Sequence, residues 1–138
     1  MSEKNVLQWD EKYSVGVRII DDQHKQLFET INSLIQILDN NPSKQQLDEI
    51  IQKLLVYKKN HFITEEKLFE QFNYELKDEH HARHMEFNTK LNSMLAECGE
   101  DSMLLAFKLV DFLEDWLIEH LMTEDQKYVE CFRQHGVK

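Results

Sequence analysis

Glycine and proline are scarce in this chain of 138 residues, which contains 3 glycines and 1 proline. Average usage of about 12 % for the two residues together would give roughly 16. Turn-rich all-β folds depend on these residues most, so an all-β fold is excluded. Long apolar runs are lacking as well, because the longest uninterrupted one, Met103 to Phe107, is far too short to cross a bilayer.

Basic residues are in the minority: 16 Lys and Arg stand against 26 Asp and Glu, which gives a formal net charge of -10. Phosphate backbones and anionic lipid headgroups should repel such a chain, so we expect neither a nucleic-acid nor a membrane partner. The first residues show no basic region followed by a long apolar stretch, and we therefore expect a cytoplasmic protein. The two cysteines, Cys98 and Cys131, lack the spacing of a metal knuckle and are predicted to be free thiols.

Apolar residues recur at intervals of three and four along most of the chain, which predicts helices. Hydrophobic residues make up 41 % of the sequence, enough to bury a core. Four amphipathic stretches are separated by residues typical of helix ends. These residues are Asp21 or Asp22 as the N-cap of the first helix, a capping box of Ser43 and Gln46 before the second, Asn73 after the second, Gly99 after the third, and Asp101 or Ser102 before the fourth.

Short connections between such long helices favour antiparallel neighbours. We therefore predict a single all-α domain over residues 1–138: an antiparallel up-down-up-down four-helix bundle at residues 21–121, an ordered N-terminal loop at residues 1–20 and a short C-terminal helix at residues 123–135. The loop carries Trp9, Tyr13 and Ile20 and is too apolar for a disordered arm. Thr123 and Gln126 repeat the capping-box spacing and predict the start of the C-terminal helix.

Polar residues fall on the apolar faces of all four predicted helices. Steps of three and four along each apolar stripe place the following residues inward: His24, His61, Glu65, His80, His84 and His120. A single inward histidine is usually a hydrogen-bonded core residue, but an ionised buried glutamate without a cation is very costly. Five histidines together with a carboxylate therefore indicate a metal site.

Asp125 can join this set only if the fourth helix breaks after His120. Five positions correspond to about 140° of rotation in an unbroken helix, and Thr123 supplies the predicted break. Five imidazoles and two carboxylates are too many ligands for one four-coordinate zinc. If two ions were bridged by both carboxylates and a solvent-derived oxygen, three histidines would bind one ion and two would bind the other. The second ion would then have one vacant coordination position. This donor set suits iron, and the vacancy suits dioxygen.

In these residues the sequence resembles the hemerythrin family, in particular the single-domain bacteriohemerythrins. The resemblance covers nearly the whole chain and rests on these residues: Trp9, Ser14-Val15-Gly16-Val17, Asp21 with Gln23-His24, His61-Phe62 with Glu65-Glu66, His80 with His84 and Phe87, and Trp116-Leu117 with His120 and Asp125. It implies a four-helix bundle that holds two iron ions with a bridging oxo or hydroxo group. By this similarity His80, His84 and His120 would hold one iron, His24 and His61 the other, and Glu65 and Asp125 would bridge them.

The same resemblance implies an apolar ligand pocket, with Tyr128 nearby. Its residues would be Leu27, Phe62, Trp116, Leu117 and Leu121. The implied function is reversible binding of dioxygen, as a carrier or store, rather than enzymatic turnover. Dioxygen would be the partner, and a protein that receives the oxygen would be a further one.

Other functions stay open at this stage. The same site could serve a module that senses oxygen, nitric oxide or redox state, or a di-iron oxidase or peroxide-handling enzyme. An oxidase is less favoured, because histidine dominates and the Glu-x-x-His pairs of ferritin-like sites are absent. A structural bundle with incidental zinc is the plainest alternative. Among the remaining polar residues, Glu66 is predicted to be surface charge or an outer contact of the site, and His81 and His135 are predicted to face solvent.

Overall fold

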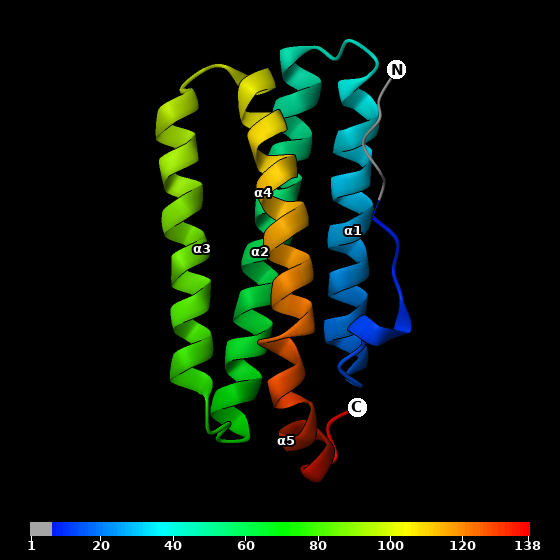
Figure 1. Ribbon diagram of the computed structural model, residues 1–138, viewed down its shortest axis with the longest axis vertical. Coiled ribbons are helices and arrows are strands. Elements are labelled where there is room, and N and C mark those ends of the chain that lie inside the picture. The colour runs from blue at the N-terminus through cyan, green and yellow to red at the C-terminus, as the bar shows by residue number, and fades with distance from the viewer. Residues whose placement is uncertain (1–6) are drawn as a thin grey trace.

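The computed structural model describes residues 7–138, and every regular element within them is helical. Four long helices make up most of the chain: α1 (Arg18–Leu38), α2 (Lys44–Gln71), α3 (Lys77–Cys98) and α4 (Ser102–Met122). Three short elements complete it, namely the 3₁₀-helices η1 (Glu11–Tyr13) and η2 (Asp125–Tyr128) and the helix α5 (Val129–Gln134). Successive long helices run in opposite directions, so the predicted antiparallel four-helix bundle is confirmed (Figure 1).

Both ends of α2 and the start of α4 follow the predicted local chemistry. The Ser43 hydroxyl accepts from the Gln46 amide at 3.1 Å while the Gln46 side chain accepts from the Ser43 amide at 2.9 Å, which forms the capping box. Asp101 caps α4 by accepting from the Leu104 amide at 3.0 Å. Asn73, after α2, has a φ of 51°, one of the few positive values among non-glycine residues.

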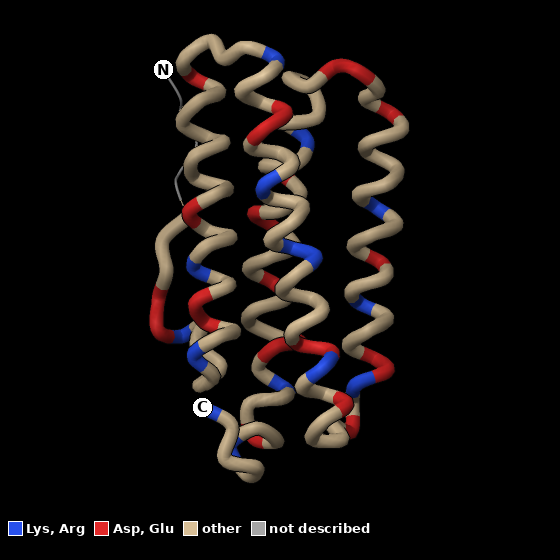
Figure 2. Tube along the Cα trace, turned by 180° about the vertical axis from the view of Figure 1, so that it is seen from behind, with Lys and Arg blue, Asp and Glu red and all other residues tan. Residues whose placement is uncertain are grey.

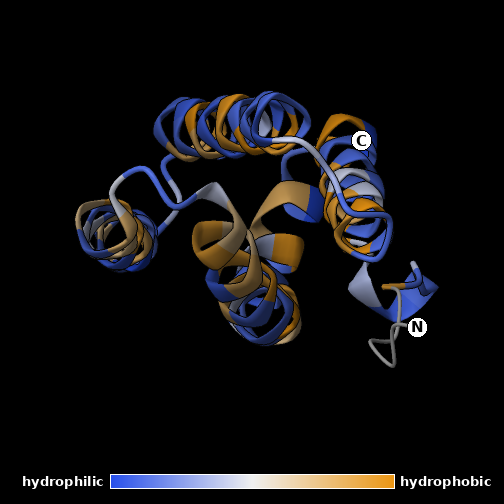
Figure 3. Ribbon diagram, turned by 90° about the horizontal axis from the view of Figure 1, so that it is seen from above, coloured by the Kyte–Doolittle hydropathy of each residue, from blue (hydrophilic) through white to orange (hydrophobic). Residues whose placement is uncertain are grey.

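The buried apolar residues form two separate clusters. The larger cluster fills the bundle interior and includes Leu27, Phe62 and Leu117. The smaller one lies where α5 and the N-terminal segment pack and includes Ile20 and Phe69. Along α1 the histidine His24 lies between Ile20 and Leu27, so the predicted polar site falls between the two clusters. Viewed from above, the four long helices surround a shared interior (Figure 3).

The predicted N-cap of the first helix is wrong. The helix begins at Arg18, before Asp21 and Asp22, and its N-cap residue Val17 makes no side-chain cap hydrogen bond. The carboxylate of Asp21 accepts instead from the Ser14 hydroxyl at 2.5 Å and from the Val15 amide at 3.0 Å. Asp21 therefore anchors the N-terminal segment to the first turn of α1. Residues 1–6 of the predicted loop lie outside the described residues.

The predicted capping box after α4 is also wrong. The Thr123 hydroxyl donates back to the Glu119 carbonyl at 2.7 Å, and the Gln126 amide donates to the Leu121 and Ser14 carbonyls at 3.2 and 3.4 Å. Both side chains satisfy carbonyl groups near the end of α4 rather than amides at the start of a new helix. The predicted break is nevertheless present, because α4 ends at Met122 and η2 begins at Asp125.

Charged residues are spread over all four long helices (Figure 2). In the part of the chain that the structure describes, no helix is both long and apolar enough to span a membrane. Cys98 is buried and Cys131 is partly buried, and both are free thiols, as predicted.

Candidate metal centre

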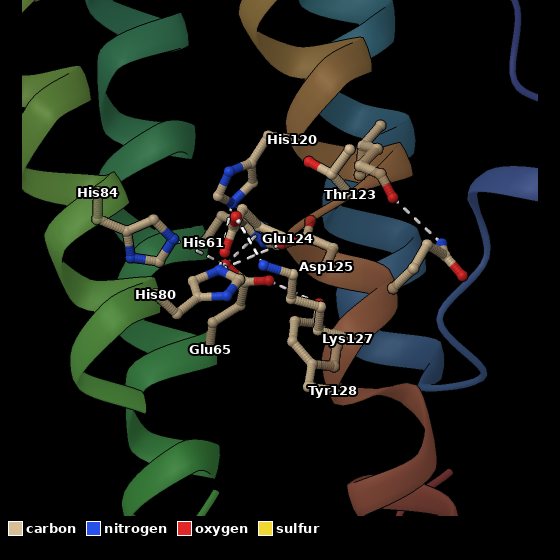
Figure 4. Close-up of polar contacts among 12 residues, drawn as sticks. His61, Glu65, His80, His84, His120, Thr123, Glu124, Asp125, Lys127 and Tyr128 are labelled. Atoms are coloured by element: carbon tan, nitrogen blue, oxygen red, sulfur yellow. Dashed lines mark hydrogen bonds and ion pairs between the residues drawn. The ribbon is translucent and has the colours of Figure 1, made fainter. Parts of the chain in front are cut away.

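The seven predicted ligand residues converge on one place in the bundle interior, and each is at most 5 % exposed. They come from every long helix and from η2: His24 from α1, His61 and Glu65 from α2, His80 and His84 from α3, His120 from α4 and Asp125 from η2. The imidazoles of α3 and α4 point toward Glu65 and Asp125 (Figure 4).

Helix periodicity and one helix break explain this convergence. His80 and His84 are one turn apart on α3, as are His61 and Glu65 on α2, so each pair projects from one helical face. Asp125 reaches the same interior because the chain leaves the α-helical path at Thr123, whose φ and ψ are -117° and -76°. The Asp125 Oδ1 atom then lies 3.0 Å from His120 Nε2.

The ligand atoms form two groups that share Glu65. One consists of Glu65, His80, His84 and His120, and the other of His24, His61, Glu65 and Asp125; within each group one ligand atom per residue lies within 4.8 Å of the others. Glu65 Oε1 lies 3.1 Å from His84 Nε2 in the first group and 3.4 Å from His61 Nε2 in the second.

Asp125 also faces both groups, with one carboxylate oxygen toward each. Its Oδ2 atom lies 3.3 Å from His24 Nε2, whereas Oδ1 lies 3.2 Å from His80 Nε2. The second oxygen of Glu65 accepts from the Tyr128 hydroxyl at 2.6 Å. Two carboxylates placed between two sets of imidazoles match a pair of cations held close together.

Hydrogen bonds at the outer ring nitrogens orient two of the imidazoles. The Nδ1 atom of His61 donates to the Gln23 side-chain oxygen at 2.8 Å, and that of His84 donates to Glu66 Oε2 at 2.7 Å. Each bond places the proton on Nδ1, so that Nε2 presents its lone pair to the centre of the site. Glu66 is therefore an outer contact of the site, one of the two roles predicted for it.

The other oxygen of Glu66 accepts from His81 Nδ1 at 2.8 Å. His81 itself is exposed, as predicted, and its imidazole covers the outer side of Glu66. Sequence reasoning missed the contact of Gln23 with His61. Gln23 is adjacent to His24, but only the packing of α1 against α2 shows which imidazole it contacts.

Burial and charge favour the ionisation states that a metal requires at His61, Glu65 and Asp125. Burial lowers the pKa of His61 to about 3, so this imidazole is neutral at pH 7. Burial and the mutual repulsion of Glu65 and Asp125 act to raise the pKa of Glu65, but the surrounding histidines hold it below its usual range. The pKa of Asp125 is also held low, because contacts with His120, His24 and His80 outweigh its burial. At His80, where burial would lower the pKa, hydrogen bonds to Asp125 and Glu65 raise it to about 10, so a bound metal would have to displace a proton there.

Several buried polar atoms at the centre have no hydrogen-bond partner among the described residues. They are both ring nitrogens of His24, Nε2 of His61, Nδ1 of His80 and both carboxylate oxygens of Asp125. Buried polar groups are normally satisfied, and buried carboxylates need a cation. Bound cations would satisfy the Nε2 and carboxylate atoms together, so the donor set fits a pair of metal ions.

An apolar cavity adjoins the site on the side of His24 and His61. Its lining residues are His24, Leu27, Ile31, Leu54, Leu55, Lys58, His61, Phe62, Phe87, Leu109, Leu113, Trp116, Leu117 and His120. Four of the five residues expected in the pocket are in this lining, whereas Leu121 is buried but does not line the cavity. Lys58 is a charged member of the lining that sequence reasoning missed, because a lysine beside an apolar stripe is usually solvated.

Comparison with known proteins gives a consistent result. The hemerythrin HHE cation binding domain matches residues 15–132. The chain belongs to the hemerythrin family. It is 30 % identical to a bacteriohemerythrin of Pseudomonas paraeruginosa over 92 % of this chain and 82 % of that protein. It is 28 % identical to a bacteriohemerythrin of Clostridium acetobutylicum over 88 % and 98 %, and 31 % identical to a myohemerythrin of Sipunculus nudus over 87 % and 88 %.

Family membership and geometry agree on the nature of the site. Within this hemerythrin the two buried histidine and carboxylate groups, joined by Glu65 and Asp125, form a di-metal site of the family's type.

Proposed function

We propose that this hemerythrin binds dioxygen reversibly, as a carrier or store, at two non-haem iron ions joined by an oxo or hydroxo bridge. In this proposal His80, His84 and His120 hold one iron, His24 and His61 hold the other, and Glu65 and Asp125 bridge the pair. When bound, the two ions supply electrons and an open coordination position to dioxygen.

The observation that carries the proposal is the position of the cavity. Three histidines lie on one side of Glu65 and two on the other, so the side with His24 and His61 has fewer protein ligands. Both of these histidines line the cavity, whereas His120 is the one histidine of the other side that does so. A ligand held there would lie next to the less saturated side of the centre.

The size of the cavity matches a diatomic molecule. Its volume, counted as the space open to the centre of a water-sized sphere, is about 20 Å³. One water molecule needs about 10–15 Å³ on this measure. The cavity therefore has room only for a small ligand of a few heavy atoms and excludes larger substrates.

The cavity wall also favours release over reaction. Leu27, Phe62 and Leu117 are buried and carry no acid or base, and among the described residues the lining contains no carboxylate or hydroxyl group. The ionisable groups of the lining are three histidines and the partly exposed Lys58. Water and protons are thus kept from a bound ligand, which slows its irreversible reduction. We infer that binding, rather than turnover, is the activity of this site, and that dioxygen is its partner.

The deciding experiment is anaerobic reconstitution with ferrous iron, followed by optical spectra through repeated cycles of oxygen and vacuum. We expect about two irons per chain and an absorption band that appears with oxygen and disappears under vacuum over several cycles. Zinc-loaded protein is the control and should show no change. Continuous oxygen consumption would indicate an oxidase, and failure of the spectrum to return would rule out a carrier.

A further inference from the structure

Among the described residues, Lys58 is the only lysine or arginine in the lining of the cavity. Most of the lining residues are buried, but Leu55, Lys58 and Trp116 are partly exposed. Leu55 and Lys58 are three residues apart on α2 and so share one face of that helix. The cavity therefore comes nearest to solvent beside these side chains, and Lys58 lies at that edge.

Uncharged groups hold the Lys58 ammonium in place. Its Nζ atom donates to the Asn88 side-chain oxygen on α3 at 2.9 Å. It also lies 5.5 Å from the ring centre of Phe62 and 5.4 Å from that of Phe87, and both rings line the cavity. The ammonium thus links α2 to α3 over two walls of the cavity.

This arrangement leaves the positive charge without full compensation. Burial, together with repulsion from Lys59, lowers the pKa of Lys58. Amide oxygens and ring faces stabilise a cation less than a carboxylate does. An anion that moved next to the ammonium would offset both the burial and the repulsion.

We propose that Lys58, positioned by Asn88, forms the entrance to the cavity and speeds the entry of small anions, while it leaves the entry of neutral molecules such as dioxygen nearly unchanged. The inference rests on the proposed function, because it takes the metal beside His24 and His61 to have an open position. A fixed cation at a low-dielectric opening raises the local concentration of anions and their rate of entry. The apolar walls behind it limit the ligand to a few heavy atoms.

Lys58→Met tests this proposal, because methionine keeps the apolar stem and removes the charge. Lys58→Arg keeps the charge, and Lys59→Met is the matched control, since Lys59 is exposed, adjacent and outside the cavity lining. Azide association with the oxidised di-iron protein is measured by stopped flow at several ionic strengths. Dioxygen association with the reduced protein reports entry of a neutral ligand through the same opening.

We expect Lys58→Met to slow azide association roughly tenfold at low ionic strength and to flatten its salt dependence. Dioxygen association should change by less than about threefold, and Lys58→Arg and Lys59→Met should keep the azide rate of the parent protein. Equal azide rates in Lys58→Met and Lys59→Met would overturn the proposal.

The failure of the proposed function gives a different pattern. Azide association reports only an open metal position, so it is measurable even if dioxygen binding is irreversible. Loss of reversible dioxygen binding with a normal Lys58 effect on azide would contradict the carrier function alone. No azide binding by the iron-loaded parent protein would mean that the open position is absent, which would overturn both proposals.

Discussion

Replacing Glu66 by alanine should weaken the binding of the metal next to His84. Glu66 Oε2 accepts from Nδ1 of His84 at 2.7 Å, and the His84 side chain is 1 % exposed, so water cannot replace the lost acceptor easily. An unsatisfied buried donor costs about 1–3 kcal/mol. Since 1.4 kcal/mol is about tenfold in affinity, the metal should bind about 10- to 100-fold more weakly.

The assay is anaerobic competition for ferrous iron between the protein and a chromophoric chelator. Glu66→Gln should recover part of the loss, because its amide oxygen can still accept from His84. His81→Ala removes the exposed partner of Glu66 but keeps the bond to His84, so it should change the affinity only a few-fold.

Glu70→Ala controls for the loss of one negative charge from the same helix. Glu70 is exposed and pairs with Lys77 rather than with a histidine of the site. If Glu66→Ala bound iron as tightly as Glu70→Ala, orientation of His84 by Glu66 would not contribute to metal binding, and the reasoning above would be refuted.

Three further predictions follow from the site and its cavity. Leu117→Glu should speed the conversion of the oxygen-bound protein to an oxidised form that no longer binds oxygen, whereas Leu117→Met should not. The conversion is measured by absorbance, and equal decay rates in the two variants would show that the apolar wall does not protect the bound ligand. Chelation of both metals should lower the unfolding temperature in calorimetry, because the buried ligands lose their cations; equal temperatures would contradict this. Stability of the metal-free protein, measured by denaturant titration, should fall on either side of about pH 6.5. It falls toward acid because the pKa of His61 is about 3 when folded, so the unfolded state takes up the proton first. It falls toward alkali because the pKa of His80, which burial would lower, is raised by Asp125 and Glu65 to about 10, and its stabilising proton is lost as the pH rises toward that value. A flat profile would contradict both shifts.

Features set by local chemistry could be predicted from the sequence. The capping box at Ser43, the cap at Asp101 and the positive φ of Asn73 each depend on a few adjacent residues. The inward faces of the helices followed from periodicity in the same way. His24, His61 and Glu65 are buried where the apolar stripes predict, because a helix places residues three and four apart on one side.

Features that depend on tertiary contacts could not be predicted. Aspartate is a residue type typical of N-caps, but the carboxylate of Asp21 accepts hydrogen bonds from Ser14 and Val15, in the segment that folds back on α1. The Thr123 and Gln126 spacing suggested a cap, but carbonyl groups at the end of α4 compete for both side chains. Lys58 was missed for a related reason, since a sequence shows that a lysine is near an apolar face but not which cavity it borders.

The position of Asp125 connects these two kinds of feature. Its inward orientation was predicted only on the condition that α4 ends between His120 and Asp125, and the helix does end there. A carboxylate buried without a partner would oppose this path, because an uncompensated buried charge is costly. The contacts of Asp125 with His24 and His120, and the metals that these residues would share, offset that cost. The break in α4 is thus a local event whose stability depends on the site, so Asp125→Ala should disturb the η2 segment as well as the binding of metal.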